Sequence, residues 1–236
     1  MDKNTSKRLR RAGIKQVLLS CLLLTIEIII FFISAGHTNV PRAWIFFSAT
    51  FVYLIVSTAA LYKFNPELLV HRLKRKREDS KLWDEILVRA NNLTVLIAVP
   101  ATAGLDVGRF HWSDLGIETA VLGFAPFIVS TILLNWAMIV NLHFEPTVRI
   151  QKDRDHKVIT SGPYKIVRHP GYLAGVLFTS SIPLILGSIL TFIPTGIYIL
   201  LIITRTLLED KTLQKELEGY PEYAKKVKHK LIPRIW

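Results

Sequence analysis

Ser161-Gly-Pro-Tyr-Lys-Ile-Val-Arg-His-Pro-Gly-Tyr172 lies between two apolar blocks of membrane length. This short segment gathers turn residues, two tyrosines, an arginine and a histidine. Pro170 removes a backbone amide donor and restricts His169 to an extended conformation, so a helix can start at Pro170 but cannot run through from Lys165. We therefore expect His169 just outside a helix N-terminus at the bilayer surface. The free amides and partial positive charge there would suit an anionic ligand group.

The composition is that of a polytopic membrane protein. Half of the 236 residues are hydrophobic, and the formal net charge is +12. The lysines and arginines cluster between apolar segments, where anionic lipid and the positive-inside rule account for them, so we expect membrane lipids as partners and no nucleic acid. The single cysteine, Cys21, excludes an intrachain disulfide and a thiolate metal cluster. No histidines stand at metal-binding spacing, and we predict no metal site.

The apolar segments predict an all-α integral membrane protein with about six transmembrane helices. The last segment is too long for one crossing of about 20 residues, and Pro183, Gly187 and Pro194 lie near its middle, so it predicts a tight helical hairpin. In chain order the segments cover about Ile14 to Ala35, Ala43 to Tyr62, Ile86 to Leu105, Leu115 to Leu142 and Tyr172 to Thr204.

Basic residues set the expected orientation. They are dense before the first span, in the run His71 to Arg77, from Arg149 to Arg168 and in the polar tail Arg205 to Trp236. The positive-inside rule then places both termini in the cytoplasm without assigning any loop against its charge. Within the spans, Glu27 is a lone acid that we assign to an interhelical contact, and the Gly104-x-x-x-Gly108 spacing favours helix packing.

Two polar clusters, Gln151 to Tyr172 and Arg205 to Asp210, are predicted to meet at one bilayer face, because the hairpin between them returns to the side where it starts. Arg205 and Glu209 stand four residues apart, so they share a helix face and can pair. The pair fits either an interfacial salt bridge or a substrate-binding arginine beside a ligand-binding acid. His169 and Tyr172 fit a site or a simple interfacial anchor, and His156 fits a site or a solvated basic loop.

Several separated motifs together carry a family resemblance. They are Thr160-Ser-Gly-Pro-Tyr-Lys-Ile-Val-Arg-His-Pro-Gly-Tyr172, Arg205-x-x-x-Glu209-Asp210, Tyr220-Pro-Glu-Tyr223 and Leu231-Ile-Pro233. Over roughly the C-terminal half, the chain resembles the isoprenylcysteine carboxyl methyltransferase family and its phospholipid methyltransferase relatives. The resemblance implies a cytoplasm-facing membrane enzyme that uses S-adenosylmethionine without the usual soluble nucleotide-binding fold. It makes 1–114 an N-terminal scaffold of three transmembrane helices and 115–236 the methyltransferase core.

The resemblance also implies roles for individual residues. Glu209 would hold a polar group of the cofactor, and Arg205 would face the methyl acceptor, so these two are the candidate catalytic residues. The remainder of the cofactor cradle would be Gln151, His156, Lys157, Val158, Ile159, Tyr164, His169, Pro170, Gly171 and Tyr172.

The expected reaction is methyl transfer to a lipid-like or prenylated small substrate, most simply carboxyl O-methylation of a prenylated cysteine or a similar lipid-linked group. An alternative within the class is N-methylation of a phospholipid amine. An alternative from another class is an NADPH-dependent, sterol-type membrane reductase, which carries a similar Arg-His-Pro-x-Tyr stretch. The segment Arg205 to Asp210 favours the methyltransferase, because we expect a segment richer in histidine and aspartate in the reductases.

Overall fold

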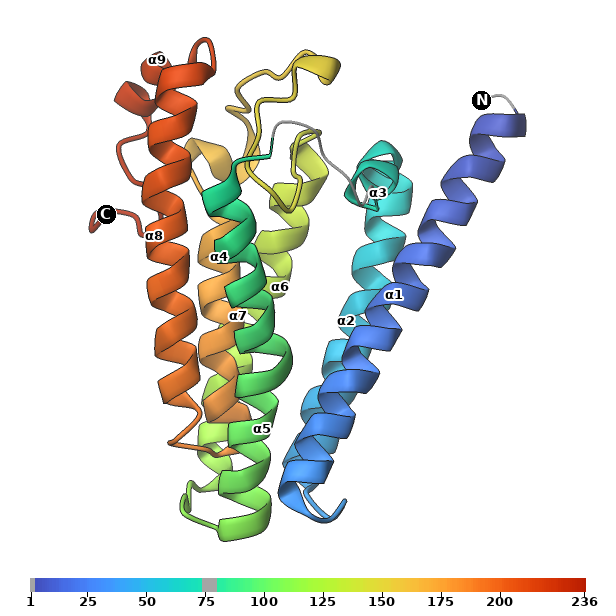
Figure 1. The fold of residues 1–236 in the computed structure, drawn as a ribbon, viewed down its shortest axis with the longest axis vertical. Coiled ribbons are helices and arrows are strands. Elements are labelled where there is room, and N and C mark those ends of the chain that lie inside the picture. The colour runs from blue at the N-terminus through green and yellow to red at the C-terminus, as the bar shows by residue number, and fades with distance from the viewer. Residues whose placement is uncertain (1–2, 74–79) are drawn as a thin grey trace.

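The computed structural model of the protein describes residues 3–73 and 80–236, and all regular secondary structure in this part of the chain is helical, without a strand (Figure 1). The prediction of an all-α membrane protein is therefore confirmed. The long or apolar helices are α1 (Lys3–Ala35), α2 (Pro41–Phe64), α4 (Leu82–Leu93), α5 (Val99–Ala103), α6 (Ile117–Val140), α7 (Pro170–Leu186) and α8 (Phe192–Glu216). Shorter elements are α3 (Pro66–Arg72), the π-helical turns η1 (Thr94–Ala98) and η2 (Gly104–Phe110), the 3₁₀ turns η3 (Lys152–Arg154) and η4 (Gly162–Lys165), and α9 (Tyr220–Lys226).

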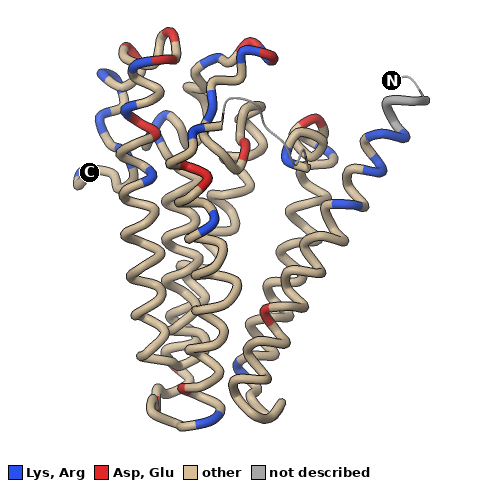
Figure 2. The backbone as a smooth tube through the Cα atoms, viewed as in Figure 1, with Lys and Arg blue, Asp and Glu red and all other residues tan. Residues whose placement is uncertain are grey.

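Five helices in the described residues are long and apolar enough to cross a membrane, counting α4 through η2 as one helix, Leu82–Phe110. The apolar helix α7 is shorter, at 17 residues, and pairs with α8 as the expected hairpin (Figure 1). Most lysines and arginines gather at the end of the bundle where α1 begins and α8 ends (Figure 2). Of the predicted basic run His71 to Arg77, the residues from position 74 onward lie outside the described part.

The hairpin turns at Gly187, which ends α7 with φ +81°, a left-handed conformation that favours glycine. Contrary to the prediction, the two prolines do not break the segment. Pro183 lies inside α7, and Pro194 lies in the first turn of α8, where its missing amide has no intrahelical partner to lose.

A buried carboxylate fixes this turn at the end of the bundle that is poor in basic residues. Asp106 of η2 is fully buried, and its Oδ2 accepts hydrogen bonds from Ser113 Oγ at 2.6 Å and Ser188 Oγ at 2.5 Å. The backbone amide of Leu190 donates to the same oxygen at 3.2 Å. The α7–α8 connection is thereby tied to the end of the third span.

Gly104 and Gly108 confirm the predicted packing face. A Cβ at Gly104 would lie 2.3 Å from the carbonyl oxygen of Phe31, and one at Gly108 would lie 2.3 Å from the Cβ of Ala35. Only glycine permits this approach to α1. Pro100 lies between the two π-helical turns of this span, where a missing amide donor disturbs the regular hydrogen-bond ladder.

The core joins α1, α2, α5, α6 and α7 through interlocking rings and aliphatic side chains, among them Phe31, Phe46, Phe47, Phe127 and Ile185. Many large apolar side chains remain exposed along the spans, including Leu18, Val52, Val121, Ile132 and Leu200. Exposing this much apolar surface to water would be unfavourable, whereas in a bilayer these side chains face lipid.

Candidate functional site

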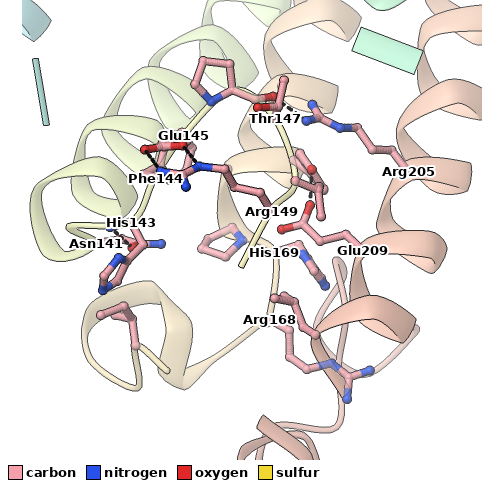
Figure 3. A pocket seen from close by; sticks show the side chains of 18 of the residues that line it. Asn141, His143, Phe144, Glu145, Thr147, Arg149, Arg168, His169, Arg205 and Glu209 are labelled. Carbon is pink, nitrogen blue, oxygen red and sulfur yellow. Dashed lines mark hydrogen bonds and ion pairs between the residues drawn. The ribbon is translucent and has the colours of Figure 1, made fainter. Parts of the chain in front are cut away.

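The candidate residues from both polar clusters line a single cavity of about 460 Å³ at the basic end of the bundle (Figure 3). This volume lies in the range of small-molecule sites. The wall includes Gln151, His156, Lys157, Val158, Ile159, Tyr164, His169, Pro170, Gly171, Tyr172, Arg205 and Glu209. The hairpin therefore brings the two clusters together, as the sequence predicts.

His169 is the residue immediately before α7, as expected, and Pro170 opens the helix. The His169 amide donates to the Lys230 carbonyl at 2.9 Å, and the Arg168 amide donates to the His229 carbonyl at 3.0 Å. The C-terminal tail therefore packs against the start of α7. The His169 ring stacks on Tyr172, with 5.6 Å between ring centroids.

Asp210 anchors the residues around this helix start. It is 2% exposed and accepts a hydrogen bond from Tyr220 at 2.9 Å, and Arg168 Nε lies 3.0 Å from its Oδ1. His169 Nε2 lies 3.4 Å from the same oxygen. Asp210 is not on the cavity wall, and it acts on the site by positioning Arg168 and His169.

Tyr164 and Tyr223 also line the cavity. Tyr164 lies in η4, and its hydroxyl accepts a hydrogen bond from Asn141 Nδ2 at 2.8 Å. Tyr223 of α9 donates to the Tyr164 carbonyl at 2.7 Å. Burial raises the pKa of both phenols, which therefore stay neutral at physiological pH. Helix α9 begins at Tyr220, and Pro221 fits its first helical turn.

Gln151 is 2% exposed and joins the two sides of the loop between α6 and α7. Its Nε2 donates to the His143 carbonyl at 2.8 Å, and its Oε1 accepts from Arg154 at 2.9 Å. The His143 and His156 rings lie beside it, with centroids 4.4 Å apart. Burial, followed by the proximity of His143, lowers the pKa of His156 to about 4, and burial also lowers the pKa of His143. Both rings are therefore neutral at pH 7.

The sequence pointed to a pair between Arg205 and Glu209, and that pairing is wrong. Arg205 instead binds Asp84 of α4, with Nε 2.6 Å from Oδ1 and Nη2 3.1 Å from Oδ2. Nη2 also donates to the Pro146 carbonyl. Asp84 is fully buried and accepts the Val148 amide at 2.6 Å as well. Burying two charges removes their hydration, and only close contact and further hydrogen bonds offset that cost. The contacts of Arg205 and Asp84 supply both.

Tyr172 connects Arg205 to Glu209. Its ring lies under the guanidinium, 5.1 Å from Cζ to the ring centroid, and its hydroxyl donates to Glu209 Oε2. Asp84 was missed by the sequence reasoning, which placed none of the family motifs in the first three spans. The signal available was an acid in the first turn of an apolar span, a position that also suits a simple helix-dipole role.

The charged side chains on the wall differ in whether they have an ion-pair partner. Arg149 binds Glu145 at 2.9 Å and Asp153 at 2.8 Å, Arg168 binds Asp210, and Arg205 binds Asp84. Glu209 is the wall carboxylate with no ion pair among residues 3–73 and 80–236, and its hydrogen bond comes from a neutral phenol. A cation in the cavity would therefore find one negative group available.

Comparison with known proteins points to one family for the part of the chain that holds most of the cavity wall. The model of the isoprenylcysteine carboxyl methyltransferase (ICMT) family matches residues 121–215, which hold most of the cavity wall. We call residues 121–215 the ICMT segment, after the family model that they match. Over 122 residues, the chain is also 25% identical to protein-S-isoprenylcysteine O-methyltransferase B of Arabidopsis thaliana, an alignment that covers 50% of this chain and 58% of that protein. The ICMT segment contains Arg205 and Glu209 but not Asp84, the partner of Arg205 in the preceding part of the chain.

Proposed function

We propose that the protein is an S-adenosylmethionine-dependent methyltransferase that acts on a membrane-embedded acceptor, most simply the carboxylate of a prenylated cysteine or a similar lipid-linked group. The cavity lined by both polar clusters carries this proposal, because its wall combines charged side chains with apolar ones. The ICMT segment and the similarity to an isoprenylcysteine O-methyltransferase support the same reaction class.

The residues of the cavity fit the proposed cofactor, which carries a positive sulfonium and a carboxylate tail. Glu209 offers a carboxylate with no ion pair among the described residues, and Tyr164 and Tyr220 on the wall offer aromatic rings, whose faces attract positive charge. The N-terminus of α7 at Pro170 and Gly171 favours a negative group. When bound, the cofactor supplies a methyl group attached to a positively charged sulfur.

Arg205 is proposed to hold the acceptor. Asp84, the Pro146 carbonyl and the Tyr172 ring fix its guanidinium from several sides, so it can orient an acceptor carboxylate without reorganising. A carboxylate is already a nucleophile and needs no general base. The contribution of the protein would then be alignment of the acceptor and exclusion of water from the buried site.

The basic end of the bundle is proposed to face the cytoplasm, with both termini and the cavity on that side (Figure 2). In this arrangement residues 115–236 act as the methyltransferase core. The scaffold 1–114 supplies the counter-ion of Arg205 through α4.

The decisive experiment is ligand binding by the full-length protein in detergent, followed by turnover in bilayers. We expect binding of S-adenosylmethionine and no binding of NADPH, and transfer of a labelled methyl group to a prenylated cysteine. Binding of NADPH alone would replace the proposal with the reductase, and label in a phospholipid amine fraction would replace the acceptor. A protein that binds neither cofactor would overturn the proposal.

A further inference from the structure

Asn91 of α4 is a buried amide that the site described above does not use. Its side chain lies on the cavity wall, and the residue is 6% exposed. Neither its Nδ2 nor its Oδ1 has a hydrogen-bond partner among the described residues. A buried amide without partners is costly, and such groups are rare in native proteins unless a ligand or water satisfies them.

The position of Asn91 on α4 places it deeper in the bundle than the charged site. Asp84, Val88, Asn91 and Val95 follow one another at intervals of four, three and four residues, so they lie on one face of the span. Asn91 lies seven residues beyond Asp84, which corresponds to about 10 Å along the helix axis. Asp84 holds Arg205 at the charged end, and we call the part of the cavity wall around Asn91 the remote arm.

This remote arm is otherwise mostly apolar. Val95 of the same span, Leu134 of α6 and Ile202 of α8 line it, and Tyr198 adds an aromatic ring. The neighbouring Asn92 is exposed and also lines the cavity, so the arm reaches the outer surface of α4. An acceptor lying in this arm would place its lipid chain beside Asn91.

We propose that Asn91 binds a hydrogen-bonding group, such as an amide or a hydroxyl, within the apolar portion of the methyl acceptor, about 10 Å from the group held by Arg205. This inference rests on the proposed function and narrows its substrate class. A side-chain amide both donates and accepts, so it matches a group that does the same. A purely hydrocarbon chain would leave both amide atoms unsatisfied.

The test uses full-length protein in lipid nanodiscs and two acceptors. One is N-acetyl-S-farnesylcysteine, and the other is an analogue of equal length whose chain carries an amide about 10 Å from the carboxylate. We expect kcat/KM to be about tenfold higher for the amide-bearing analogue, which is the gain that one additional hydrogen bond to the acceptor would give. Asn91→Leu should remove this preference by lowering kcat/KM for the analogue alone.

A second readout separates ligand binding from a structural role. Without ligand, Asn91→Leu should raise the Tm by about 2–4 °C, because leucine replaces an unsatisfied amide of similar size. Thr195→Val is the matched control, since Thr195 is 2% exposed, its hydroxyl has no partner in the described part of the chain and it is outside the cavity wall. It should raise the Tm in the same direction and leave the acceptor preference unchanged.

Three results would overturn the inference: no preference in the wild-type protein, an equal loss for both acceptors in Asn91→Leu, or a lowered Tm in that variant. Direct measurement of S-adenosylmethionine binding distinguishes this failure from the failure of the proposed function. A protein that binds the cofactor and methylates both acceptors equally refutes only the role of Asn91. A protein that binds no cofactor refutes the proposed function itself.

Discussion

Arg205 in α8 and Asp84 in α4, 121 positions apart in the sequence, form a buried ion pair with Nε and Oδ1 2.6 Å apart. The side chain of Arg205 is 10% exposed and that of Asp84 is fully buried. The pair joins the ICMT segment to the preceding helices and fixes the guanidinium that faces the cavity. Removing one partner would leave the other charge buried and unpaired.

Asp84→Ala should therefore lower the free energy of unfolding by about 3–5 kcal/mol. The measurement is chemical unfolding of the purified protein in detergent. Glu85→Ala is the control on the next residue, because Glu85 forms a more exposed pair with Arg89 at 3.5 Å. It should cost about 1 kcal/mol or less. Equal losses in the two variants would show that the buried pair contributes nothing special.

Glu209→Ala should reduce the affinity for S-adenosylmethionine by about 100-fold, because the cavity loses its carboxylate without an ion pair. Equilibrium binding of labelled cofactor measures the effect. Glu216→Ala, seven residues later on α8, removes an acid that binds Lys81 at 2.8 Å and is not on the cavity wall. Cofactor affinity that survives in Glu209→Ala would refute the assigned role.

Arg205→Ala should spare cofactor binding and remove turnover, since Arg205 is assigned to the acceptor. This variant also leaves the buried carboxylate of Asp84 unpaired, so we expect it to unfold more easily than the wild-type protein. Arg205→Lys keeps the positive charge but not the two-pronged geometry, and it should fold while losing at least about tenfold in kcat/KM. A loss of cofactor affinity in Arg205→Lys, with the KM for the acceptor unchanged, would reverse the assignments of Arg205 and Glu209.

Tyr172 is expected to act through its two neighbours. Tyr172→Phe keeps the ring under Arg205 but removes the hydroxyl that donates to Glu209, so cofactor affinity should fall about tenfold with little change in acceptor KM. Tyr172→Leu removes the ring as well and should raise acceptor KM too. Identical kinetics in the two variants would mean that the contact between ring and guanidinium has no effect on the acceptor.

The histidine pair should make stability depend on pH. The pKa of His156 is lowered from an ordinary 6.5 to about 4, so between these values the unfolded chain binds more protons than the folded protein. Stability is therefore fully present above pH 6.5 and is lost as the pH falls toward 4. His156→Gln, which keeps an acceptor near the Gln151 amide, should flatten the Tm profile in this window. An unchanged profile would contradict burial of a neutral His156.

Local sequence patterns predicted a large part of this molecule. Apolar runs of membrane length determine where helices form, because every backbone polar group in a bilayer must be satisfied within the segment. Pro170 determined the start of α7, and a glycine at position 187 determined where the hairpin turns. The hairpin then required the clusters around His169 and Glu209 to lie at the same end, and both line one cavity.

The tertiary structure alone decided which charges pair. From spacing, Glu209 is the nearest acid to Arg205 on its helix face, yet packing of α4 against α8 places Asp84 there and leaves Glu209 to Tyr172. Which charged residues of different helices pair depends on how those helices pack together. The periodicity of a single helix does not determine that packing. The same holds for Asn91: only the packing of the helices around it shows that its side chain has no hydrogen-bond partner within residues 3–73 and 80–236.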